Sequence, residues 1–518
     1  MSESASVPEY DGPVYNTESK IPAGTLILTI VQHFFALAVY MTYPVIISGA
    51  IGGEEHMTTT LISATLIGCG IATILQACRR LGSGQVLPII PNSSYLPASL
   101  LAATGGGLPM LYGMLIAGGI FEIIISRLTR FFRYVFPMEI CGTVLFLLGI
   151  AIVPFAFPLF CGSTDSAPLD PAATAVGIIT LASMIILSVI RKRIFKFYST
   201  LMGILIGFIA AILLGVFNLE TLTNITTIPV FSVPEFAFLT EGYAFNPALL
   251  APFIIAVICL VMKTTGNIEM LNRYTKSESK KSLRRGLLAE GIGLTISGFL
   301  GGIGTGTSSS AAGLVVSTGV AARKVGFGLG ILLIICGFLP VFGWFFHLIP
   351  KPILGAVLIY AVVFVMMSGI TSIASRVLDS RRIFVVLLPI LFGVSSAVCP
   401  YLYTSLPEWA EYFLASPLTA GSVAAVVLGL LLKIGIPHRK TLSITPSSDV
   451  SAFVMDCAGL WTLDKLQSHS LGTELSNEIK EEKEAKALTM YLSHGRETIE
   501  IDISYRNGTV KHLSRPCL

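Results

Sequence analysis

Two interrupted apolar segments, PIIPNSSYLP at residues 88–97 and GGIGTGTSSSAAG at residues 301–313, decide the fold of this 518-residue chain. Each lies within a stretch that is apolar enough to enter a membrane, and each is broken by proline or glycine beside hydroxyl side chains. Backbone at membrane depth leaves the helical form only where protein or a polar cavity satisfies its N–H and C=O groups. One broken span in each half of the chain therefore predicts a binding site near the membrane midplane, as in secondary transporters.

The composition places these segments in a polytopic membrane protein. Hydrophobic residues make up 53% of the chain and charged residues 12%, and the mean hydropathy is +0.79, far from the average of soluble domains. A membrane crossing needs about 20 apolar residues. We therefore expect an all-α integral membrane protein with 14 transmembrane segments in the lipid bilayer. They are predicted at 24–50, 58–78, 85–103, 108–127, 137–160, 172–190, 199–217, 247–268, 286–302, 305–321, 325–348, 352–372, 382–404 and 418–436.

The distribution of charge predicts the orientation. Cytoplasmic loops collect lysine and arginine, and basic clusters such as Arg79-Arg80, Arg191–Arg193 and Arg439-Lys440 follow the even-numbered segments. Acidic pairs such as Glu54-Glu55 follow odd-numbered segments. Both termini are therefore expected in the cytoplasm, and the compact loops without a targeting signal favour the cytoplasmic membrane of a bacterial cell.

Several functional classes are excluded by the sequence. The net charge of +4 is explained by topology, and no basic cluster alternates with exposed aromatic residues as in nucleic-acid binders. The nine cysteines show no CxxC or metal-like spacing. No Walker, HExxH or nucleophile-elbow pattern occurs. We expect no enzymatic activity, no cofactor, no metal site and no nucleic-acid partner.

The charged end of the chain differs from the apolar part. The sequence predicts three parts: an N-terminal cytoplasmic tail at 1–20, a transmembrane permease domain at 21–437, and a small cytoplasmic α/β domain at 441–518. Residues 478–487 read as a solvated helix, and 498–504 read as a strand that leads to a type I′ turn at Asn507-Gly508. The last domain is expected to regulate the protein, or simply to stabilise it or dock a partner.

Six short motifs occur in a fixed order along the apolar segments. They are Gln32-His33, Ser94-Tyr95, Lys263-Thr264-Thr265-Gly266-Asn267, Glu290-Gly291, Gly313 with Thr318-Gly319, and Ile349-Pro350-Lys351-Pro352-Ile353-Leu354-Gly355. In sequence, spacing and segment number they resemble the nucleobase–ascorbate transporter family, the group of xanthine, uracil and urate permeases. The resemblance covers residues 20–437.

This resemblance implies a 7+7 inverted repeat, with a core domain of segments 1–4 and 8–11 and a gate domain of segments 5–7 and 12–14. The broken third and tenth segments would each hold a short extended stretch before a half-helix, whose N–H groups bind the base. Ser94, Tyr95, Ser309 and Ser310 occupy the corresponding substrate-binding positions. The resemblance further implies a purine or pyrimidine substrate, an elevator-like movement, H+ symport and a homodimer.

Four positions depart from the family pattern. Lys263 stands where the family has glutamate, Asn267 where it has aspartate, and Ser310-Ala311 where it has Gln-Asn. A lysine only donates hydrogen bonds, so it cannot accept the N–H groups of a base as a carboxylate does. Lys263 is expected to face an anionic or acceptor-rich substrate, to take over proton coupling or replace a bound cation, or to snorkel to the membrane surface.

Four further polar residues lie within apolar segments. Gln32 and His33 are expected to line the site, or else to hydrogen-bond between helices. Glu122 and Glu290 are buried acids by position, and either is expected to join Lys263 in a coupling or charge network, or to neutralise it.

The sequence as a whole predicts a secondary active or facilitative transporter of a nucleobase. Two alternatives stay open. One is a small-anion transporter on the same fold, favoured by a free positive charge at Lys263. The other is a transporter-derived ligand sensor that signals through residues 441–518.

Overall fold

The structure is a computed structural model. In it the chain forms two compact units. It describes residues 13–127, 138–163, 169–190, 193–218, 228–240, 242–277, 279–374, 380–403, 414, 417–432, 439–443, 449–461, 465–481, 485–492, 498–505 and 510–516. The first unit comprises 1–132, 148–365 and 406–413, and the second comprises 133–147, 366–405 and 414–518.

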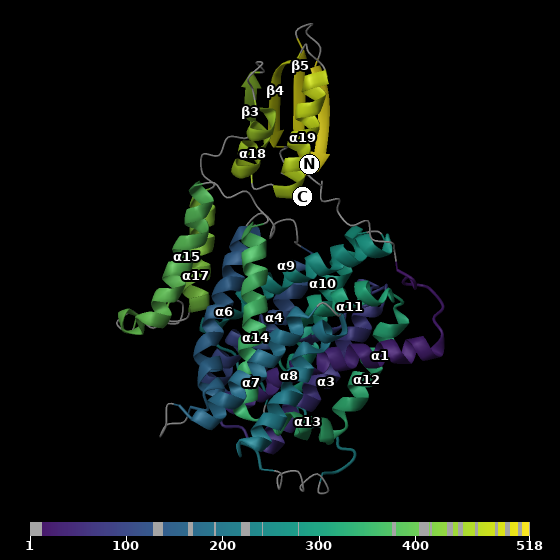
Figure 1. The fold of residues 1–518 in the computed structure, drawn as a ribbon, viewed down its shortest axis with the longest axis vertical. Coiled ribbons are helices and arrows are strands. Elements are labelled where there is room, and N and C mark those ends of the chain that lie inside the picture. Colours follow the sequence, from purple (N-terminus) through teal and green to yellow (C-terminus); the bar gives the residue numbers. More distant parts are fainter. Residues whose placement is uncertain are drawn as a thin grey trace. The chain divides into compact units, whose positions relative to one another are not determined.

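The first unit is built from helices (Figure 1). They are α1 (Ala23–Ala38), η1 (Val39–Met41), α2 (Thr42–Ala50), α3 (Glu55–Ala77), α4 (Leu96–Ile125), α7 (Pro171–Val189), α8 (Arg193–Leu213), η3 (Pro247–Leu249), α9 (Leu250–Thr275), α10 (Ser279–Leu300), α11 (Ser309–Thr318), α12 (Lys324–Gly337) and α13 (Pro340–His347). Helices α6 (Met138–Phe160) and α14 (Lys351–Ala374) contribute residues to both units. Two short strands, β1 (Ile89–Pro91) and β2 (Thr305–Thr307), interrupt the helices at the two broken segments.

Each predicted apolar segment overlaps a described helix, and the segments 85–103 and 108–127 share helix α4. Among the described residues, seven helical stretches are long and apolar enough on their own to cross a membrane, and the bent pair α12 and α13 would make an eighth. The seven are Ala23–Ala50, Glu55–Ala77, Leu96–Ile125, Glu139–Phe160, Pro171–Val189, Leu250–Thr275 and Lys351–Ala374. The chain is therefore a mostly helical membrane protein, while the total of 14 crossings stays a prediction.

Glycine and proline explain the sharp breaks between these helices. Within α4, Gly107 has φ 70° and ψ −169°, a conformation that glycine adopts without steric penalty. This break falls between the predicted segments 85–103 and 108–127. Helices α12 and α13 bend by 78°, and α13 begins at Pro340, which cannot donate the N–H that a continuous helix needs.

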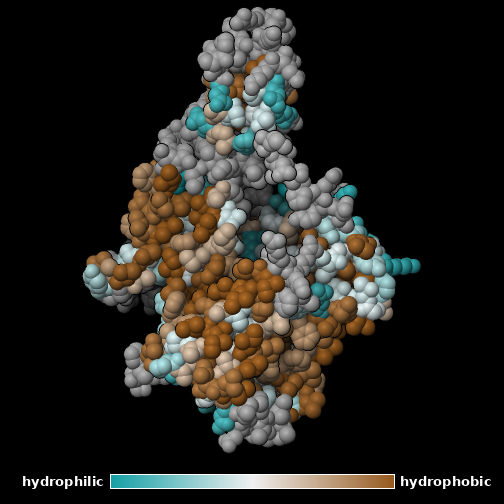
Figure 2. Space-filling view, viewed as in Figure 1, coloured by the Kyte–Doolittle hydropathy of each residue, from teal (hydrophilic) through white to brown (hydrophobic). Residues whose placement is uncertain are grey.

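The outside of the helical part is apolar. On α7 and α8, Ile186 is 63% exposed and Leu213 79% exposed, and Figure 2 shows hydrophobic residues spread over the visible face of the helices. A soluble monomer seldom exposes so large an apolar surface. In a membrane protein this surface contacts lipid.

Small residues bring the helices around the broken segments close together. A Cβ atom on Gly70 of α3 would lie 2.6 Å from the carbonyl oxygen of Gly330 of α12, and one on Gly330 would lie 2.7 Å from the carbonyl oxygen of Gly70. Gly68 of α3 meets Ser297 of α10 in the same manner. Glycine lets membrane helices approach at backbone distance, so α3, α10 and α12 form a tightly packed support.

An N-terminal strap, residues 13–20, crosses the ends of several of these helices. The N–H of Tyr15 donates to the carbonyl of Gly319 at 3.0 Å, and the N–H of Ala321 donates to the carbonyl of Tyr15 at 2.7 Å. These bonds form a parallel bridge between Tyr15 and Val320. The strap is thereby fixed to the turn that connects α11 with α12.

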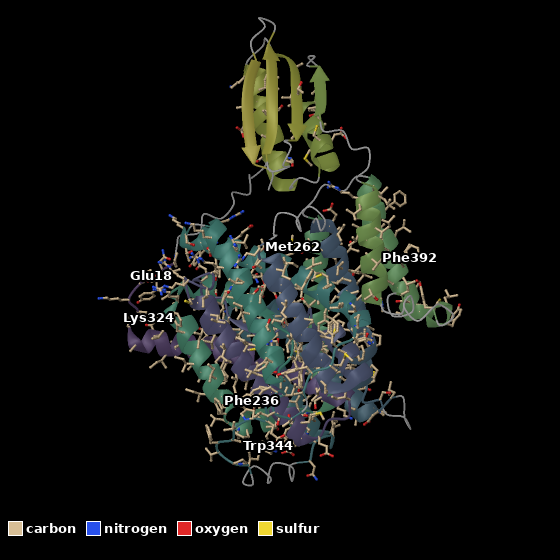
Figure 3. All side chains as sticks on the ribbon, turned by 180° about the vertical axis from the view of Figure 1, so that it is seen from behind. Glu18, Phe236, Met262, Lys324, Trp344 and Phe392 are labelled. Atoms are coloured by element: carbon tan, nitrogen blue, oxygen red, sulfur yellow. The ribbon has the colours of Figure 1, made fainter. Side chains whose placement is uncertain are left out.

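Ion pairs fix the same strap to a second helix. The carboxylate of Glu18 lies 3.0 Å from Nη1 of Arg79, just beyond α3, and 2.9 Å from Nη2 of Arg323, just before α12. Figure 3 shows Glu18 and Lys324 on the same side of the unit, away from Phe236 and Trp344. The strap therefore joins a helix of the first half of the chain to one of the second half.

The second unit contains the first part of α6 together with α15 (Ser380–Val398), η4 (Pro400–Leu402) and α17 (Pro417–Leu431). Here Oε1 of Glu139 lies 3.7 Å from Nε of Arg382. Their side chains are only 3% and 6% exposed, so this ion pair is buried.

The same unit holds the charged end of the chain. Strands β3 (Arg439–Ser443), β4 (Ala485–Leu492), β5 (Thr498–Tyr505) and β6 (Val510–Pro516) form an antiparallel sheet in chain order. Helices α18 (Val450–Trp461) and α19 (Lys465–Glu481) pack on it around Val454, Leu475, Leu488 and Ile501. The helix predicted at 478–487 is wrong at its end, because Ala485 already pairs with β5. The turn predicted at Asn507-Gly508 lies outside the described residues.

Candidate functional site

The two broken segments meet in the first unit. Strands β1 and β2 pair antiparallel, with Ile89 opposite Thr307 and Pro91 opposite Thr305. Helix α4 begins shortly after β1, and helix α11 begins shortly after β2. Residues more than 200 positions apart in the chain thus form one small sheet, and each of its strands leads into a helix N-terminus. The first N–H groups of such helices lack partners within the helix and can bind a ligand.

Asn92 fastens the two segments to each other. Its backbone N–H donates to the carbonyl of Gly304 at 3.0 Å, and its Nδ2 donates to the carbonyl of Thr307 at 3.1 Å. Its Oδ1 accepts the N–H of Ser94 at 3.0 Å. The predicted site residue Ser94 is therefore buried and held in place by Asn92, which sequence reasoning did not single out.

Tyr95 packs directly on the second broken segment. It is 1% exposed, and a Cβ atom on Gly304 would lie 2.6 Å from its Cγ. Its hydroxyl donates a long hydrogen bond, 3.5 Å, to Oε2 of Glu122. The side chain of Tyr95 therefore packs between the two segments and is shielded from solvent.

A directed chain of hydrogen bonds ends on Glu290. Nδ2 of Asn267 donates to Oγ1 of Thr307 at 3.2 Å, and the hydroxyls of Thr307 and Thr264 lie 2.6 Å apart. The hydroxyl of Thr264 donates to Oε1 of Glu290 at 2.8 Å, and the N–H of Thr307 donates to the same oxygen at 2.7 Å. The predicted residues Asn267 and Glu290 are thus brought together through two threonines. A buried carboxylate needs donors, and this requirement is the signal that could have identified Thr264 and Thr307.

Glu122 completes this group. Glu122 and Glu290 are both 0% exposed, and their carboxyl groups lie close enough to act on each other electrostatically. The structure therefore pairs the two predicted acids with each other.

Lys263 lies on the same helix as Thr264 and Asn267 and is half-buried. Its charge acts on Glu290, but within the described part of the chain no carboxylate comes within ion-pair distance of its ammonium group. The positive charge of Lys263 is therefore close to the acids without being locked to one of them.

Ser309 and Ser310 are exposed at the N-terminus of α11. The hydroxyl of Ser310 lies 2.7 Å from that of Ser308 and 3.0 Å from that of Tyr40. A ligand can reach this helix N-terminus, in contrast to the buried Ser94 and Tyr95.

The two predicted site residues of α1, Gln32 and His33, differ in burial and in hydrogen-bond partner. Gln32 is half-buried, and its side chain hydrogen-bonds to Tyr198 of α8. His33 is fully buried, and its Nδ1 donates to the carbonyl of Thr29 at 2.9 Å within the same helix. The described contacts do not join either residue to the acids or to Lys263.

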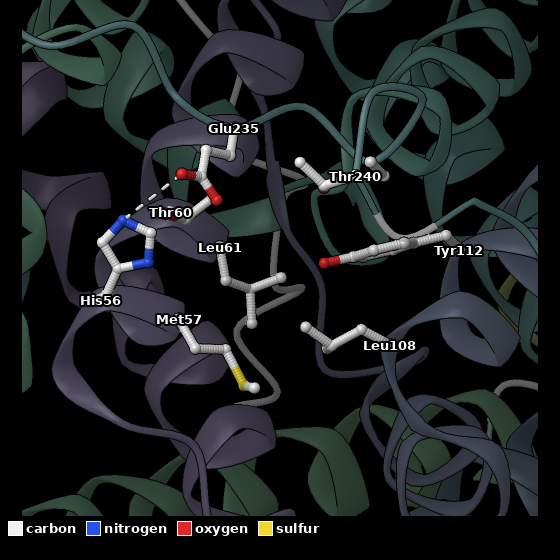
Figure 4. Close-up of a pocket in the computed structure, with 9 residues that line it drawn as sticks. His56, Met57, Thr60, Leu61, Leu108, Tyr112, Glu235 and Thr240 are labelled. Carbon is white, nitrogen blue, oxygen red and sulfur yellow. Dashed lines mark ion pairs between the residues drawn. The ribbon is translucent and has the colours of Figure 1, made fainter.

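A separate cavity of about 180 Å³ lies near the first turns of α3 (Figure 4). It is lined by His56, Met57, Thr60, Leu61, Leu108, Tyr112, Glu235, Ala237 and Thr240. In this lining, Nε2 of His56 lies 3.9 Å from Oε1 of Glu235, and both side chains are largely exposed. None of the predicted site residues lines this cavity. Across the described residues, no group of three His, Cys, Asp or Glu side chains could hold a metal ion.

Comparison with known proteins gives several sequence relatives. The model of a permease family, Xan_ur_permease, matches residues 24–402. The chain is 28% identical over 425 residues to a putative purine permease, CPE0397, of Clostridium perfringens, covering 81% of this chain and 93% of that protein. It is 27% identical over 419 residues to the nucleobase transporter PlUacP of Paenibacillus larvae, covering 78% and 94%. A xanthine permease of Bacillus subtilis is 26% identical over 416 residues, covering 79% and 94%.

Solved structures share the fold at lower identity. The transmembrane domain of the cyanobacterial bicarbonate transporter BicA superposes with a TM-score of 0.50 at 15% identity, covering 79% of this chain and 99% of that one. The murine anion transporter Slc26a9 in its inward-facing state superposes with a TM-score of 0.52 at 10% identity, covering 82% and 71%.

Proposed function

The chain belongs to the permease family described by the Xan_ur_permease model, and from this membership we propose that it carries a purine or pyrimidine nucleobase of the xanthine, urate or uracil class. Relatives that align over most of both chains are named purine, nucleobase and xanthine permeases. The chain works as a transporter and not as an enzyme.

The observation that carries this proposal is the pairing of β1 with β2 beside the N-terminus of α11. Exposed Ser309 and Ser310 offer hydroxyls and unpaired N–H groups to a planar ligand. The half-buried Lys263 adds a cation that donates hydrogen bonds. Together these groups suit the carbonyl and ring-nitrogen edge of an oxidised purine such as xanthine or urate.

The family architecture suggests how the site would move across the membrane. We propose 14 transmembrane segments in a 7+7 inverted repeat, with a core of segments 1–4 and 8–11 that moves against a gate of segments 5–7 and 12–14. The equivalent strand-and-helix breaks at β1–α4 and β2–α11 support the repeat. The proposal also includes a homodimer in the cytoplasmic membrane, both termini in the cytoplasm, and residues 441–518 as a cytoplasmic domain.

Transport of a small anion is the second candidate, and Lys263 is the observation that favours it. No carboxylate of the described residues forms an ion pair with its ammonium group, so an anion could bind there. The likeness to bicarbonate and anion transporters concerns the fold alone.

Uptake by proteoliposomes that contain the purified protein separates the two candidates. Radiolabelled xanthine, urate, uracil and bicarbonate are offered in turn. We expect uptake of at least one base, reduced by Ser310→Ala and unchanged by Ser188→Ala, a matched substitution on the exposed end of α7. Uptake of bicarbonate without uptake of any base would contradict the nucleobase proposal.

A further inference from the structure

The cavity beside α3 is closed on one side by residues 228–240, a segment that crosses the ends of several helices. The N–H of Ser232 donates to the carbonyl of Phe338, just beyond α12, at 3.1 Å. The N–H of Ala237 donates to the carbonyl of Leu300, at the end of α10, at 3.4 Å. Three lining residues come from this segment, and the others come from α3 and α4. The cavity is therefore built by three parts of the chain that the fold holds together.

The inner wall of this cavity is apolar. Leu61 is 1% exposed, Ala237 2% and Leu108 5%, and Met57 lies beside them in the lining. The enclosed volume is about 180 Å³. Since an apolar cavity of about 150 Å³ already admits benzene, this one has room for a six-membered ring with one small polar substituent.

Polar groups in the rest of the lining can all accept a hydrogen bond. They are the carboxylate of Glu235 and the hydroxyls of Tyr112, Thr60 and Thr240. Figure 4 shows the carboxylate of Glu235 and the hydroxyl of Tyr112 both directed towards Leu61. The described lining contains no lysine or arginine. An ammonium group, which carries three N–H donors and a positive charge, therefore suits this set of acceptors, whereas an anion would be repelled by Glu235.

The ion pair already present at Glu235 is weak. Nε2 of His56 lies 3.9 Å from its Oε1, and the two side chains are 74% and 59% exposed. That separation is too long for a hydrogen bond, and exposed ion pairs contribute little to stability. A ligand cation can therefore take the place of the imidazole beside this carboxylate at little cost.

The inner wall also contacts the start of the second broken segment. Gly301, where the chain leaves α10, has φ 89°. A Cβ atom on Gly301 would lie 3.0 Å from Cβ of Ala237 and 3.5 Å from Cζ of Tyr112. A ligand that fills the cavity would therefore pack behind these two residues and stabilise the present course of the chain at Gly301.

We propose that this cavity is a binding site for a small organic cation that has an ammonium group on a compact apolar body. The apolar body fills the space beside Leu61 and Leu108, and the ammonium group donates to Glu235 and to the hydroxyl of Tyr112. None of the residues proposed to bind the base lines this cavity. The site therefore goes beyond the nucleobase function and does not depend on it.

Binding of benzylammonium, the form of benzylamine present at neutral pH, tests the proposal. Benzyl alcohol and benzoate carry the same ring with a neutral and a negative substituent. Each compound is titrated into the purified native protein in detergent, and the melting temperature is followed, because a ligand that binds only the folded state raises it. We expect benzylammonium to bind at least about fivefold more tightly than either analogue.

Two variants locate the bound cation. Glu235→Gln should lower the affinity for benzylammonium to that for benzyl alcohol, and this exposed position tolerates the change. Thr60→Phe should abolish binding, because the new ring occupies the cavity. Glu54→Gln is the matched control, since it removes a negative charge next to the start of α3 from a residue that does not line the cavity, and it should bind benzylammonium as the native protein does.

Three results would overturn the proposal. Equal affinities for benzylammonium and benzyl alcohol would show that the carboxylate selects no cation. Native affinity for benzylammonium in Glu235→Gln or Thr60→Phe would place the ligand outside the cavity. Failure of benzylammonium to raise the melting temperature at millimolar concentrations would show that the cavity binds no such cation.

Discussion

Gly304 and Tyr95 lie against each other at the point where the two broken segments cross. A Cβ atom on Gly304 would be 2.6 Å from Cγ of Tyr95, and Tyr95 is too deeply buried to move aside. A side chain at position 304, just before β2, would therefore clash with Tyr95 from the first half of the chain. This position requires glycine for that reason.

Gly304→Ala should destabilise the protein, by about 1–3 kcal/mol, because the added methyl group overpacks a closed site. Thermal unfolding of the purified protein in detergent measures the effect. Gly313→Ala is the matched control, since a Cβ atom there meets nothing within 4 Å. Equal melting temperatures for the two variants would show that the contact with Tyr95 is not tight.

Asn92→Ala should lower both the stability of the protein and its affinity for the base. It removes the bonds to Thr307 and Ser94 and leaves a buried carbonyl and a buried N–H without these partners, at about 1–3 kcal/mol each. We expect at least a tenfold loss of affinity by calorimetry. Native affinity in this variant would mean that Asn92 does not hold the two segments in register.

The N-terminal strap should depend on its backbone bonds rather than on its ion pairs. Exposed ion pairs contribute about 0–1 kcal/mol, so Glu18→Gln should leave the strap in place. Tyr15→Pro removes the N–H that bonds to Gly319 and should release the strap. Hydrogen exchange of residues 13–20 distinguishes the variants, and faster exchange in Glu18→Gln than in Tyr15→Pro would contradict the prediction.

Arg382→Met should destabilise the second unit strongly. It would leave the buried carboxylate of Glu139 without its ion-pair partner, a change of about 3–5 kcal/mol. The double variant Arg382→Met/Glu139→Leu should regain most of the loss, because neither charge then stays buried. Thermal unfolding gives the melting temperatures of the single and the double variant, which are then compared. A double variant that is no more stable than the single one would mean that the charge of Glu139 is not the cause.

Much of this architecture follows from local sequence. The clusters of proline or glycine at 88–97 and 301–313 mark the breaks, whereas single prolines such as Pro154 and Pro389 lie inside helices. Glu122 and Glu290 are recognisable as buried acids from the apolar residues around them. That the two acids lie next to each other cannot be predicted from the sequence, because it depends on how α4 packs on α10. The sequence predicts only that either acid pairs with Lys263.

Other features of the structure also differ from what the local sequence predicts, for physical reasons. Asn92 and Thr307 join segments more than 200 residues apart, so no local pattern relates them. The Glu-, Lys- and Ala-rich run at 478–487 favours a helix by intrinsic propensity, but pairing of Ala485 and Ala487 with β5 overrides that preference. Thr264 and Thr307 lie 43 positions apart, and only the folded chain brings both to the same oxygen of Glu290.

The most direct test of the central claim is ligand-induced thermal stabilisation of the purified native protein and of Lys263→Met. Xanthine, urate, uracil, bicarbonate and sulfate are compared, because a ligand at 100 times its Kd stabilises the folded state by about 2.7 kcal/mol. We predict that at least one base raises the melting temperature of the native protein and that Lys263→Met removes this shift. Stabilisation by bicarbonate or sulfate alone would contradict a nucleobase site between the two broken segments.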